Sequence, residues 1–456
     1  MNQKLSAGFK LRFALAELGF TTIRAILDFY LLYYYTDVAG INPALAGSAL
    51  LVAKLTWDSV NDPLFGYWSD RTRSRFGRRR IYMLIAALPL ALTIWLLFSL
   101  PHGLTGAAAF FTVLLTFLLL DTFNTMAGVP YASLIAEVTH DYQERSSLGL
   151  YKGGNAVLGY ILGAAGITVL VGIFKGAGLD LQHAWSITGA IFGVLMLITL
   201  LATTLTIKEP AGLEMEPSSI PPIRSIWLCF KNRPFVLLML IFMLGSFAFT
   251  IQAALLPYLI QYQLGMSDQM SFIMIVSLLT TGIFAIPAKL LADKLNKGPA
   301  YAAGMFLGAL TFTLAFFFLP RHATPWVYVV AVFIGIAFST HWVIPYAMMP
   351  DVIEYDEKMT GERREGIYYG ISNFLTKLAI ALGTAVPGWA LAWFGYVPNA
   401  AQTERALFGI RFFYAMVPAL VMLIFLPIAI RFPITRKSHA ALRQELESEK
   451  SNKQTN

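Results

Sequence analysis

Residues Leu45 to Tyr67 read LAGSALLVAKLTWDSVNDPLFGY, an apolar run long enough to cross a bilayer that nevertheless contains Lys54, Asp58 and Asp62. These three positions are spaced four residues apart, so their side chains project from one face of a helix. A charge at the middle of a bilayer costs about 2.5–3.5 kcal/mol to insert, and two carboxylates on one face also repel each other. Such a pair persists only where something compensates it, and a bound cation is the simplest compensator.

Apolar runs of this length recur along the whole chain. Of its 456 residues, 57% are hydrophobic and 13% charged, and the mean hydropathy is +0.62, values that exclude an ordinary soluble domain. Because helices satisfy their own backbone groups in lipid, we expect an all-α integral membrane protein with twelve transmembrane helices. The predicted spans are 12–36, 45–67, 81–100, 106–132, 147–174, 184–206, 235–261, 270–292, 300–319, 326–349, 367–395 and 406–430.

Arginines in one short loop indicate the orientation. The segment after the second span, DRTRSRFGRRR, contains six arginines, whereas the loops after the first, third and seventh spans contain neither Lys nor Arg. Because positively charged loops stay in the cytoplasm, both termini are predicted to be cytoplasmic, in a bacterial inner (cytoplasmic) membrane. The net charge of +8 is therefore a signal of topology, and no nucleic-acid partner is expected.

A polar, proline-rich segment separates two halves that share motifs. Pro-Tyr-Ala occurs in the fourth span from Pro130 and in the tenth from Pro345, and each time an acid follows six or seven residues after the proline. Motifs repeated in the same sense indicate parallel repeats, as in transporters whose halves rock about a central site. The predicted parts are an N-terminal six-helix bundle over 1–207, a cytoplasmic linker over 208–234, a C-terminal six-helix bundle over 235–431 and a cytoplasmic tail over 432–456.

Several motifs carry a family resemblance. The turn GYWSDRTRSRFGRR, from Gly66, resembles the signature of the major facilitator superfamily. The motifs YYYTDVAG from Tyr33, WDSVNDPLFG from Trp57 and DVIEYDEKMTGERREGIYYGISNFLTK from Asp351 are similar to those of its glycoside–pentoside–hexuronide:cation symporters, the melibiose permease-like transporters. The resemblance implies the major facilitator fold, with two pseudo-symmetric six-helix bundles.

The resemblance also implies a cation site. In the family, two aspartates, the asparagine between them and a threonine of the fourth helix serve the coupling cation, and these positions are Asp58, Asp62, Asn61 and Thr125 here. Their carboxylate, amide and hydroxyl oxygens suit Na⁺ or Li⁺, and protonation of one carboxylate would suit H⁺. A structural ion pair between Lys54 and Asp58 is the alternative, and it is compatible with cation binding.

The sugar site of the family is only partly retained. Its carboxylates fall at Thr21 and Gly128, and its fourth-helix tryptophan falls at Ala132. The substrate-binding candidates that remain by resemblance are Lys152, Trp342, Asn373 and Lys377, together with the position Gly128. Next to Trp342, His341 is expected to be a hydrogen-bonded core residue.

New charges appear on the first helix. Arg24 and Asp28 lie one turn apart and are further substrate candidates, with a purely structural ion pair as the alternative. Asp121 lies two turns before Gly128 on the fourth helix and so shares its face. A cavity with more basic residues and fewer acids than the family pattern would suit an anionic sugar, such as a uronic or sulfonated one.

Charged residues at the predicted cytoplasmic helix ends are candidates for a gate. Ion pairs among them would close the inner side and break when it opens, whereas a solvated surface that only sets orientation is the alternative. Exposed pairs are each worth under about 1 kcal/mol, so several would have to act together. The gate candidates are Asp70, Arg71, Glu144, Arg145, Asp351, Glu354, Arg363 and Arg364.

These features predict a secondary active transporter that carries out symport of a sugar or glycoside, coupled to Na⁺ or alternatively to H⁺ or Li⁺, by alternating access. The expected partners are a small-molecule substrate and membrane lipid, the protein is expected to be a monomer, and no cofactor is implied beyond the coupling cation. An enzyme is not expected, since no nucleophile–base set or phosphate loop is found. Two alternatives stay open: a lysolipid transporter of the same superfamily, and a membrane receptor or scaffold that does not translocate its ligand.

Overall fold

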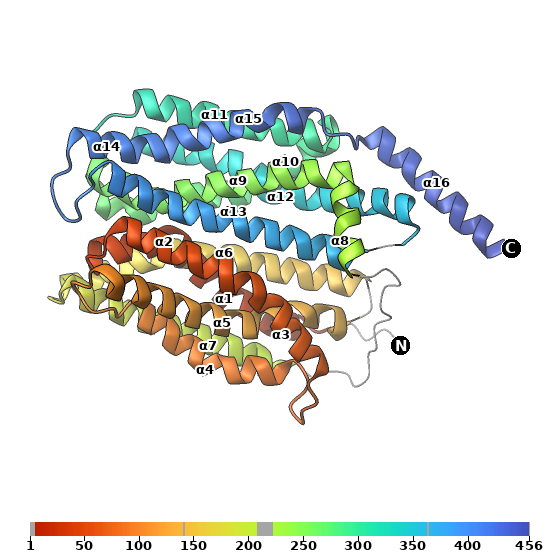
Figure 1. The fold of residues 1–456 in the computed structure, drawn as a ribbon, viewed down its shortest axis with the longest axis horizontal. Helices are drawn as coiled ribbons and strands as arrows, with labels where there is room; N and C mark the ends of the chain where they lie inside the picture. Colours follow the sequence, from red (N-terminus) through yellow and green to blue (C-terminus); the bar gives the residue numbers. More distant parts are fainter. Residues whose placement is uncertain (1–4, 140–141, 208–221, 363, 456) are drawn as a thin grey trace. The chain divides into compact units, whose positions relative to one another are not determined.

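The protein is helical, and no strand occurs in the residues that the structure describes. The computed structural model describes residues 5–139, 142–207, 222–362 and 364–455 (Figure 1). The helices are α1 Ala7–Tyr33, α2 Pro43–Ala53, α3 Ser59–Arg71, α4 Arg80–Leu97, α5 Gly106–Val138, α6 Tyr142–Gly176, α7 Leu181–Thr206, α8 Pro222–Lys231, α9 Arg233–Tyr258, α10 Met270–Leu295, α11 Lys297–Phe318, α12 Trp326–Thr360, α13 Glu365–Trp393, α14 Glu404–Arg411, α15 Val417–Ile430 and α16 Arg436–Thr455. The predicted all-α fold class is therefore confirmed.

The chain forms two compact units. Unit 1 consists of Met1–Met215, Ala253–Ile275 and Thr384–Ile410, and unit 2 consists of Glu216–Gln252, Val276–Gly383 and Arg411–Asn456. Helices α9, α10 and α13 therefore contribute one end to each unit. These units are defined by contacts and do not follow the order of the chain. The two six-helix bundles predicted over 1–207 and 235–431 therefore stay a prediction.

Ten helices in the described ranges are long and apolar enough to cross a membrane. The first and second of the twelve predicted spans are not among them, so the count of twelve stays a prediction. Helix α1 carries three charges, Glu17, Arg24 and Asp28, in its middle. The second span is interrupted by a π turn between α2 and α3.

Large apolar side chains cover the outer surface of the helices. Ile286 in α10 is 69% exposed, Ile424 in α15 is 67% exposed and Phe318 at the end of α11 is 75% exposed. Apolar surface on this scale is a liability in water but is the natural covering of a protein in hydrocarbon. The exposed surface therefore agrees with an integral membrane protein.

In unit 1, glycines bring α6 close to α1. Helix α1 packs against α6 and α7, and α4 packs against α5 and α7. A Cβ at Gly159 would overlap the Leu18 carbonyl oxygen, and a Cβ at Gly163 would overlap that of Thr22. Glycines four residues apart allow two membrane helices to approach closely.

Unit 2 uses the same device and adds a helix cap. Helix α11 packs against α12 and α15, and a Cβ at Gly304 would overlap the Thr340 side chain of α12. The guanidinium of Arg411 donates to the carbonyl oxygens of Ala315 at 2.9 Å and Leu319 at 2.6 Å. A cation at this position stabilises the carboxyl end of α11.

Helix α8 occupies part of the predicted linker. Its residues, Pro222–Lys231, lie within 208–234, whose first fourteen positions, 208–221, are outside the described ranges. Helix α16 likewise occupies most of the predicted tail. Both helices belong to unit 2.

Within the described residues four π turns interrupt the helices, and two of them follow the first helix of each predicted half, α1 and α9. The turn Tyr34–Val38 follows α1 and the turn Leu259–Leu264 follows α9. Each is followed by a glycine with positive φ, Gly40 at 73° and Gly265 at 62°. A left-handed conformation there favours glycine because it has no Cβ. The other two turns are Lys54–Asp58 and Phe412–Met416.

Candidate functional site

The predicted cation ligands lie on α3, on the π turn before it and on α5. Asp58 ends the π turn and is 9% exposed, and Asn61 in the next turn is fully buried. Thr125, on α5, is 5% exposed, and α3 packs against α5. π turns in helices are frequent at functional sites.

Hydrogen bonds join these residues to one another and to Asp121. The Thr125 hydroxyl donates to Asp62 Oδ1 at 3.2 Å. The Asn61 amide Nδ2 donates to Asp121 Oδ2 at 2.7 Å and to the Asp121 backbone oxygen at 3.2 Å. Thr125 and Asp62 are therefore joined by one hydrogen bond, and Asn61 and Asp121 by two others.

The amide oxygen of Asn61 is a buried acceptor that nothing in the structure satisfies. Its Oδ1 is buried and has no hydrogen-bond partner, although a buried acceptor without a donor is costly. Among the described residues, no three His, Cys, Asp or Glu side chains are arranged to hold a metal ion. Carboxylate, amide and hydroxyl oxygens are hard ligands, and a set in which only some of them are charged suits a monovalent cation.

Two neighbours of the cation candidates are held by α5. The Lys54 ammonium lies 5.2 Å from the centroid of the Phe117 ring, a cation–π distance. The Trp57 indole donates to the Thr122 hydroxyl at 2.8 Å. These contacts fix the side of the π turn that faces α5.

Lys152, predicted from the resemblance as a substrate ligand, forms an ion pair in the structure. Its ammonium lies 3.0 Å from Glu17 Oε2 of α1 and 4.3 Å from the centroid of the Tyr131 ring. Glu17 therefore compensates the charge of the Lys152 ammonium, which the resemblance assigns to substrate binding. The pairing joins helices α1, α5 and α6.

Arg24, Asp28 and Tyr160 form a second polar group in unit 1. The Arg24 Nε lies 3.6 Å from Asp28 Oδ2, which also accepts a hydrogen bond of 2.8 Å from the Tyr160 hydroxyl. The side chain of Arg24 is 51% exposed. The predicted position Gly128 faces the Phe20 ring, which lies 3.7 Å from where a Cβ would be.

Trp342, Asn373 and Lys377, the remaining substrate candidates, belong to unit 2. Trp342 is partly buried, and its ring lies edge-on at 5.4 Å from Phe249. Asn373 is exposed, and Lys377 follows it one turn later on α13. The prediction for His341 is confirmed: it is fully buried, and its ring nitrogens lie 3.2 Å from the Ser246 hydroxyl and 3.1 Å from the Tyr301 hydroxyl.

Asp37, which the sequence did not single out, is the centre of a polar network in unit 1. It is 1% exposed, and it accepts hydrogen bonds from Thr36 at 2.6 Å, from Tyr396 at 2.6 Å and from Tyr262. The Asn399 amide donates to the Asp37 backbone oxygen at 2.7 Å. No Lys, Arg or His of the described chain forms an ion pair with Asp37. The motif YYYTDVAG contains Asp37 and Thr36 and could have drawn attention to them, but the tyrosine partners of Asp37 lie more than two hundred residues away.

The gate candidates of unit 1 are described only in part. Glu144 Oε2 lies 2.9 Å from the Lys10 ammonium and accepts the Leu5 backbone N–H at 3.1 Å. Arg71 contacts the ring and hydroxyl of Tyr67 on its own helix. The side chains of Asp70 and Arg145 are not described.

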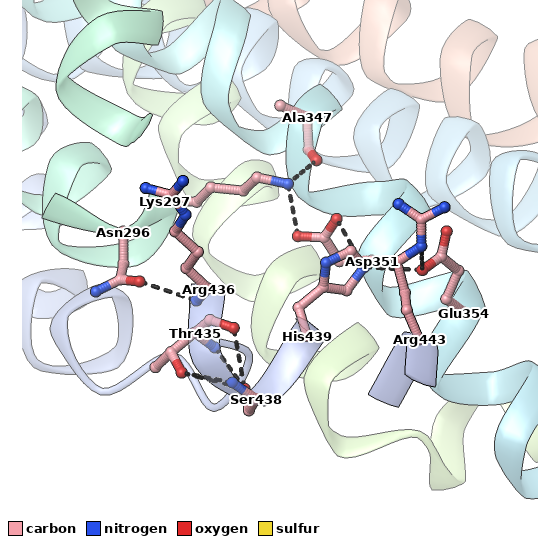
Figure 2. A network of polar contacts seen from close by, with 10 residues as sticks. All are labelled: Asn296, Lys297, Ala347, Asp351, Glu354, Thr435, Arg436, Ser438, His439 and Arg443. Atoms are coloured by element: carbon pink, nitrogen blue, oxygen red, sulfur yellow. Dashed lines mark hydrogen bonds and ion pairs between the residues drawn. The ribbon is translucent and has the colours of Figure 1, made fainter. Parts of the chain in front are cut away.

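Helix α16 takes part in the network of the gate candidates in unit 2. Lys297 Nζ lies 2.6 Å from Asp351 Oδ2 and donates to the Ala347 backbone oxygen at 2.8 Å. Figure 2 shows His439, from α16, between Asp351 at 3.6 Å and Glu354 at 2.8 Å. Every one of these residues lies in unit 2, whereas the predicted gate joins the two halves of the chain.

A buried ion pair lies beside the last gate candidates. Arg363 is outside the described residues, but Arg364 donates from Nε to Asp356 Oδ2 at 2.9 Å, and both side chains are at most 2% exposed. Burial lowers the pKa of Arg364, but the hydrogen bond and charge of Asp356 outweigh it and raise the pKa. The sequence indicates Arg364 as a gate candidate but does not indicate its partner Asp356, which lies eight residues earlier.

The sequence matches a known family over nearly its whole length. Residues 12–436 match the family described as "MFS/sugar transport protein". An "Uncharacterized symporter sll1374" of Synechocystis sp. is 29% identical, and the match covers 99% of this chain and 98% of that protein. A "Glucuronide carrier protein homolog" of Escherichia coli is 27% identical over 99% of this chain and 97% of its own length.

The fold is also shared with a solved structure. The nucleoside transporter NupG matches with a TM-score of 0.63, over 92% of this chain and 98% of that chain. The two sequences are only 14% identical, so this likeness concerns the fold and not the substrate.

Proposed function

This chain belongs to the MFS/sugar transport protein family and, within it, to the glycoside–pentoside–hexuronide symporters, and from that premise we propose that Na⁺ drives its symport of a sugar or glycoside by alternating access. Li⁺ and H⁺ are the alternative coupling ions. The protein is an integral membrane transporter of the major facilitator fold. We further propose that it acts as a monomer in a bacterial inner membrane with both termini in the cytoplasm.

The observations that support the cation proposal are the Thr125–Asp62 hydrogen bond and the buried amide oxygen of the neighbouring Asn61. The buried Asn61 Oδ1 has no hydrogen-bond donor, while Thr125 already orients one oxygen of Asp62. A cation bound there would satisfy the amide oxygen and reduce the repulsion between Asp58 and Asp62. Coupling follows if substrate binds more tightly to the form stabilised by the cation, and the effect is reciprocal.

An anionic sugar is the substrate class that we favour. Lys152 is paired with Glu17 and Arg24 with Asp28, so the preference for an anion rests on the resemblance to carriers of such sugars. The glucuronide carrier homolog, whose match covers almost all of both chains, supports the same class. Arg binds carboxylate and sulfonate groups through its planar pair of N–H donors.

Alternating access needs closures that form and break in turn. The Asp37 network lies within unit 1, and the pairs of Asp351 and Glu354 with Lys297 and His439 lie within unit 2. In the proposed cycle these networks order the helix ends of their own units. Short polar networks of this kind are suited to breaking and reforming as helices shift.

The first test is ligand-induced thermal stabilisation of the purified protein against neutral glycosides, uronides, sulfonated sugars and lysolipids, with and without Na⁺. We expect a uronide or sulfonated sugar to stabilise the protein more strongly in Na⁺ than in choline. Asp58→Asn and Asp62→Asn should abolish this Na⁺ dependence, whereas Asp268→Asn, in an exposed turn, should leave it unchanged.

The other outcomes discriminate between the candidate functions. Stabilisation by sugars without any effect of Na⁺ would reject sodium coupling, and a matching dependence on pH would point to H⁺. Stabilisation by lysolipids alone would reject the sugar class. Sugar binding without uptake into proteoliposomes under any cation gradient would favour a receptor that does not transport.

A further inference from the structure

Unit 2 contains a cavity at the end where α9 begins and α15 ends. Its volume is about 620 Å³. The first turn of α9, the last turns of α12, the segment after α15 and one face of α16 form its walls. None of its lining residues is a candidate for the cation or the substrate, so the proposed transport does not account for it.

The lining is mainly basic and apolar. Arg233, Lys358 and Arg431 are basic, and Glu445 is the acidic member. Glu445 forms an ion pair with Lys358, but neither Arg233 nor Arg431 has an ion pair within the described chain. Two exposed guanidinium groups therefore favour a ligand that carries negative charge.

The depth of the cavity is that of lipid headgroups. Arg233 is the first residue of a membrane-crossing helix, and Arg431 directly follows the last residue of another, which ends at Ile430. Pro234 and Leu237 line the cavity on the membrane side, and Leu240, a turn further into the span, is 39% exposed. A ligand with an anionic head and an apolar tail would satisfy both parts of this surface.

We propose that this cavity binds an anionic phospholipid, with its phosphate between Arg233 and Arg431 and the beginning of its acyl chains along Pro234 and Leu237. The inference depends on membrane insertion but not on the proposed transport. Basic pockets beside transmembrane helices on the cytoplasmic side are suited to such headgroups.

Lipid at this site would hold helix α16 against the rest of unit 2. One face of α16, with Leu442, lines the cavity. Two other residues of α16 contact Glu354 of α12: His439 lies 2.8 Å from this carboxylate and Arg443 lies 4.0 Å from it (Figure 2). The lipid therefore acts on the same helix that pairs with gate candidates on α12.

The test uses the delipidated full-length protein in detergent, with binding followed by native mass spectrometry and thermal stabilisation. The probes are phosphatidylglycerol, phosphatidylcholine with the same acyl chains, and glycerol 3-phosphate. We expect phosphatidylglycerol to bind about tenfold more tightly than phosphatidylcholine, and Arg233→Gln and Arg431→Gln each to reduce that preference several-fold. Lys437→Gln, on α16 but outside the cavity, is the matched control and should keep it.

Hydrogen exchange gives a second readout that needs no variant. Amides of α16 should exchange more slowly with phosphatidylglycerol than with phosphatidylcholine. Equal affinities for the two lipids, or equal loss in the Lys437→Gln control, would overturn the proposal. Stabilisation by glycerol 3-phosphate equal to that by the lipid would assign the cavity to a soluble phosphate instead.

Discussion

Asn61 shows how a single buried atom supports a functional proposal. Its amide nitrogen donates a hydrogen bond to Asp121, and its amide oxygen is buried and accepts no hydrogen bond. The sequence predicted Asn61 and its partners Asp62 and Thr125 from a family motif. It could not predict that Asp121 orients the amide, because that contact depends on how α3 and α5 pack.

Thr125 provides the most specific test at the residue scale. We expect Thr125→Val to weaken the apparent Na⁺ affinity about tenfold, since one hydroxyl ligand and its hydrogen bond to Asp62 are worth about 1–1.5 kcal/mol. The measurement is the Na⁺ concentration for half-maximal uptake in proteoliposomes. Thr188→Val, a buried threonine that donates only to the carbonyl of Ala184 on its own helix, is the control, and an equal effect there would contradict the assignment.

The Glu17–Lys152 ion pair is a second testable contact of individual residues. Lys152→Gln should lower the melting temperature because it leaves Glu17 as an uncompensated charge between helices. The double variant Glu17→Gln, Lys152→Gln should be more stable than that single variant. A double-mutant cycle with strictly additive effects would show that the pair is not coupled.

Lys152 also shows what the sequence could not provide. The family pattern predicts Lys152 as a substrate ligand, but 135 positions separate it from Glu17 and no sequence rule joins the two. The same limitation applies to Asp37, whose partners Tyr262 and Tyr396 lie far along the chain. Local motifs identify which residues carry charge, while long-range packing decides their partners.

At the scale of the helix, the sequence predicts the membrane-crossing helices better than the shorter elements. Apolar runs predicted the ten helices that are long enough to cross a membrane, because a span needs a minimum length. Most of the predicted ends lie within about six residues of the helix ends, but α12 continues past its predicted end at 349 to Thr360. The apolar runs did not predict the π turn Lys54–Asp58, which depends on contacts with α5. They also missed α8, which lies in the segment predicted as linker. The polar composition of the tail from Thr435 predicts a helical or disordered extension, and α16 is a helix there.

Gly163 is the element-scale prediction. We expect Gly163→Ala to lower the melting temperature, because the added Cβ would overlap the Thr22 carbonyl oxygen and push α6 from α1. Gly172→Ala is the matched control on the same helix, where a Cβ meets nothing within 4 Å. There the substitution should be neutral or stabilising by up to about 1 kcal/mol. Equal destabilisation at both positions would indicate a general effect of replacing glycine in α6.

At the scale of the whole molecule, orientation is the prediction that a simple measurement can check. The chain has one cysteine, Cys229, so Cys229→Ala gives a background free of thiols. In that background, Lys437→Cys should be labelled by a membrane-impermeant maleimide only in inverted vesicles, and Ser267→Cys only in intact cells or spheroplasts. Both positions are exposed. The reverse pattern would contradict the positive-inside assignment.

The separation between Asp37 and its partners has a consequence for biosynthesis. Tyr396 lies 359 residues after Asp37, and at a typical synthesis rate the interval between them is roughly 20–70 s. During that time the carboxylate of Asp37 lacks the hydrogen bond from the Tyr396 hydroxyl. Unit 1 cannot be completed until the segment Thr384–Ile410 has been made, so the N-terminal part of the protein must be tolerated by the insertion machinery in an unfinished state.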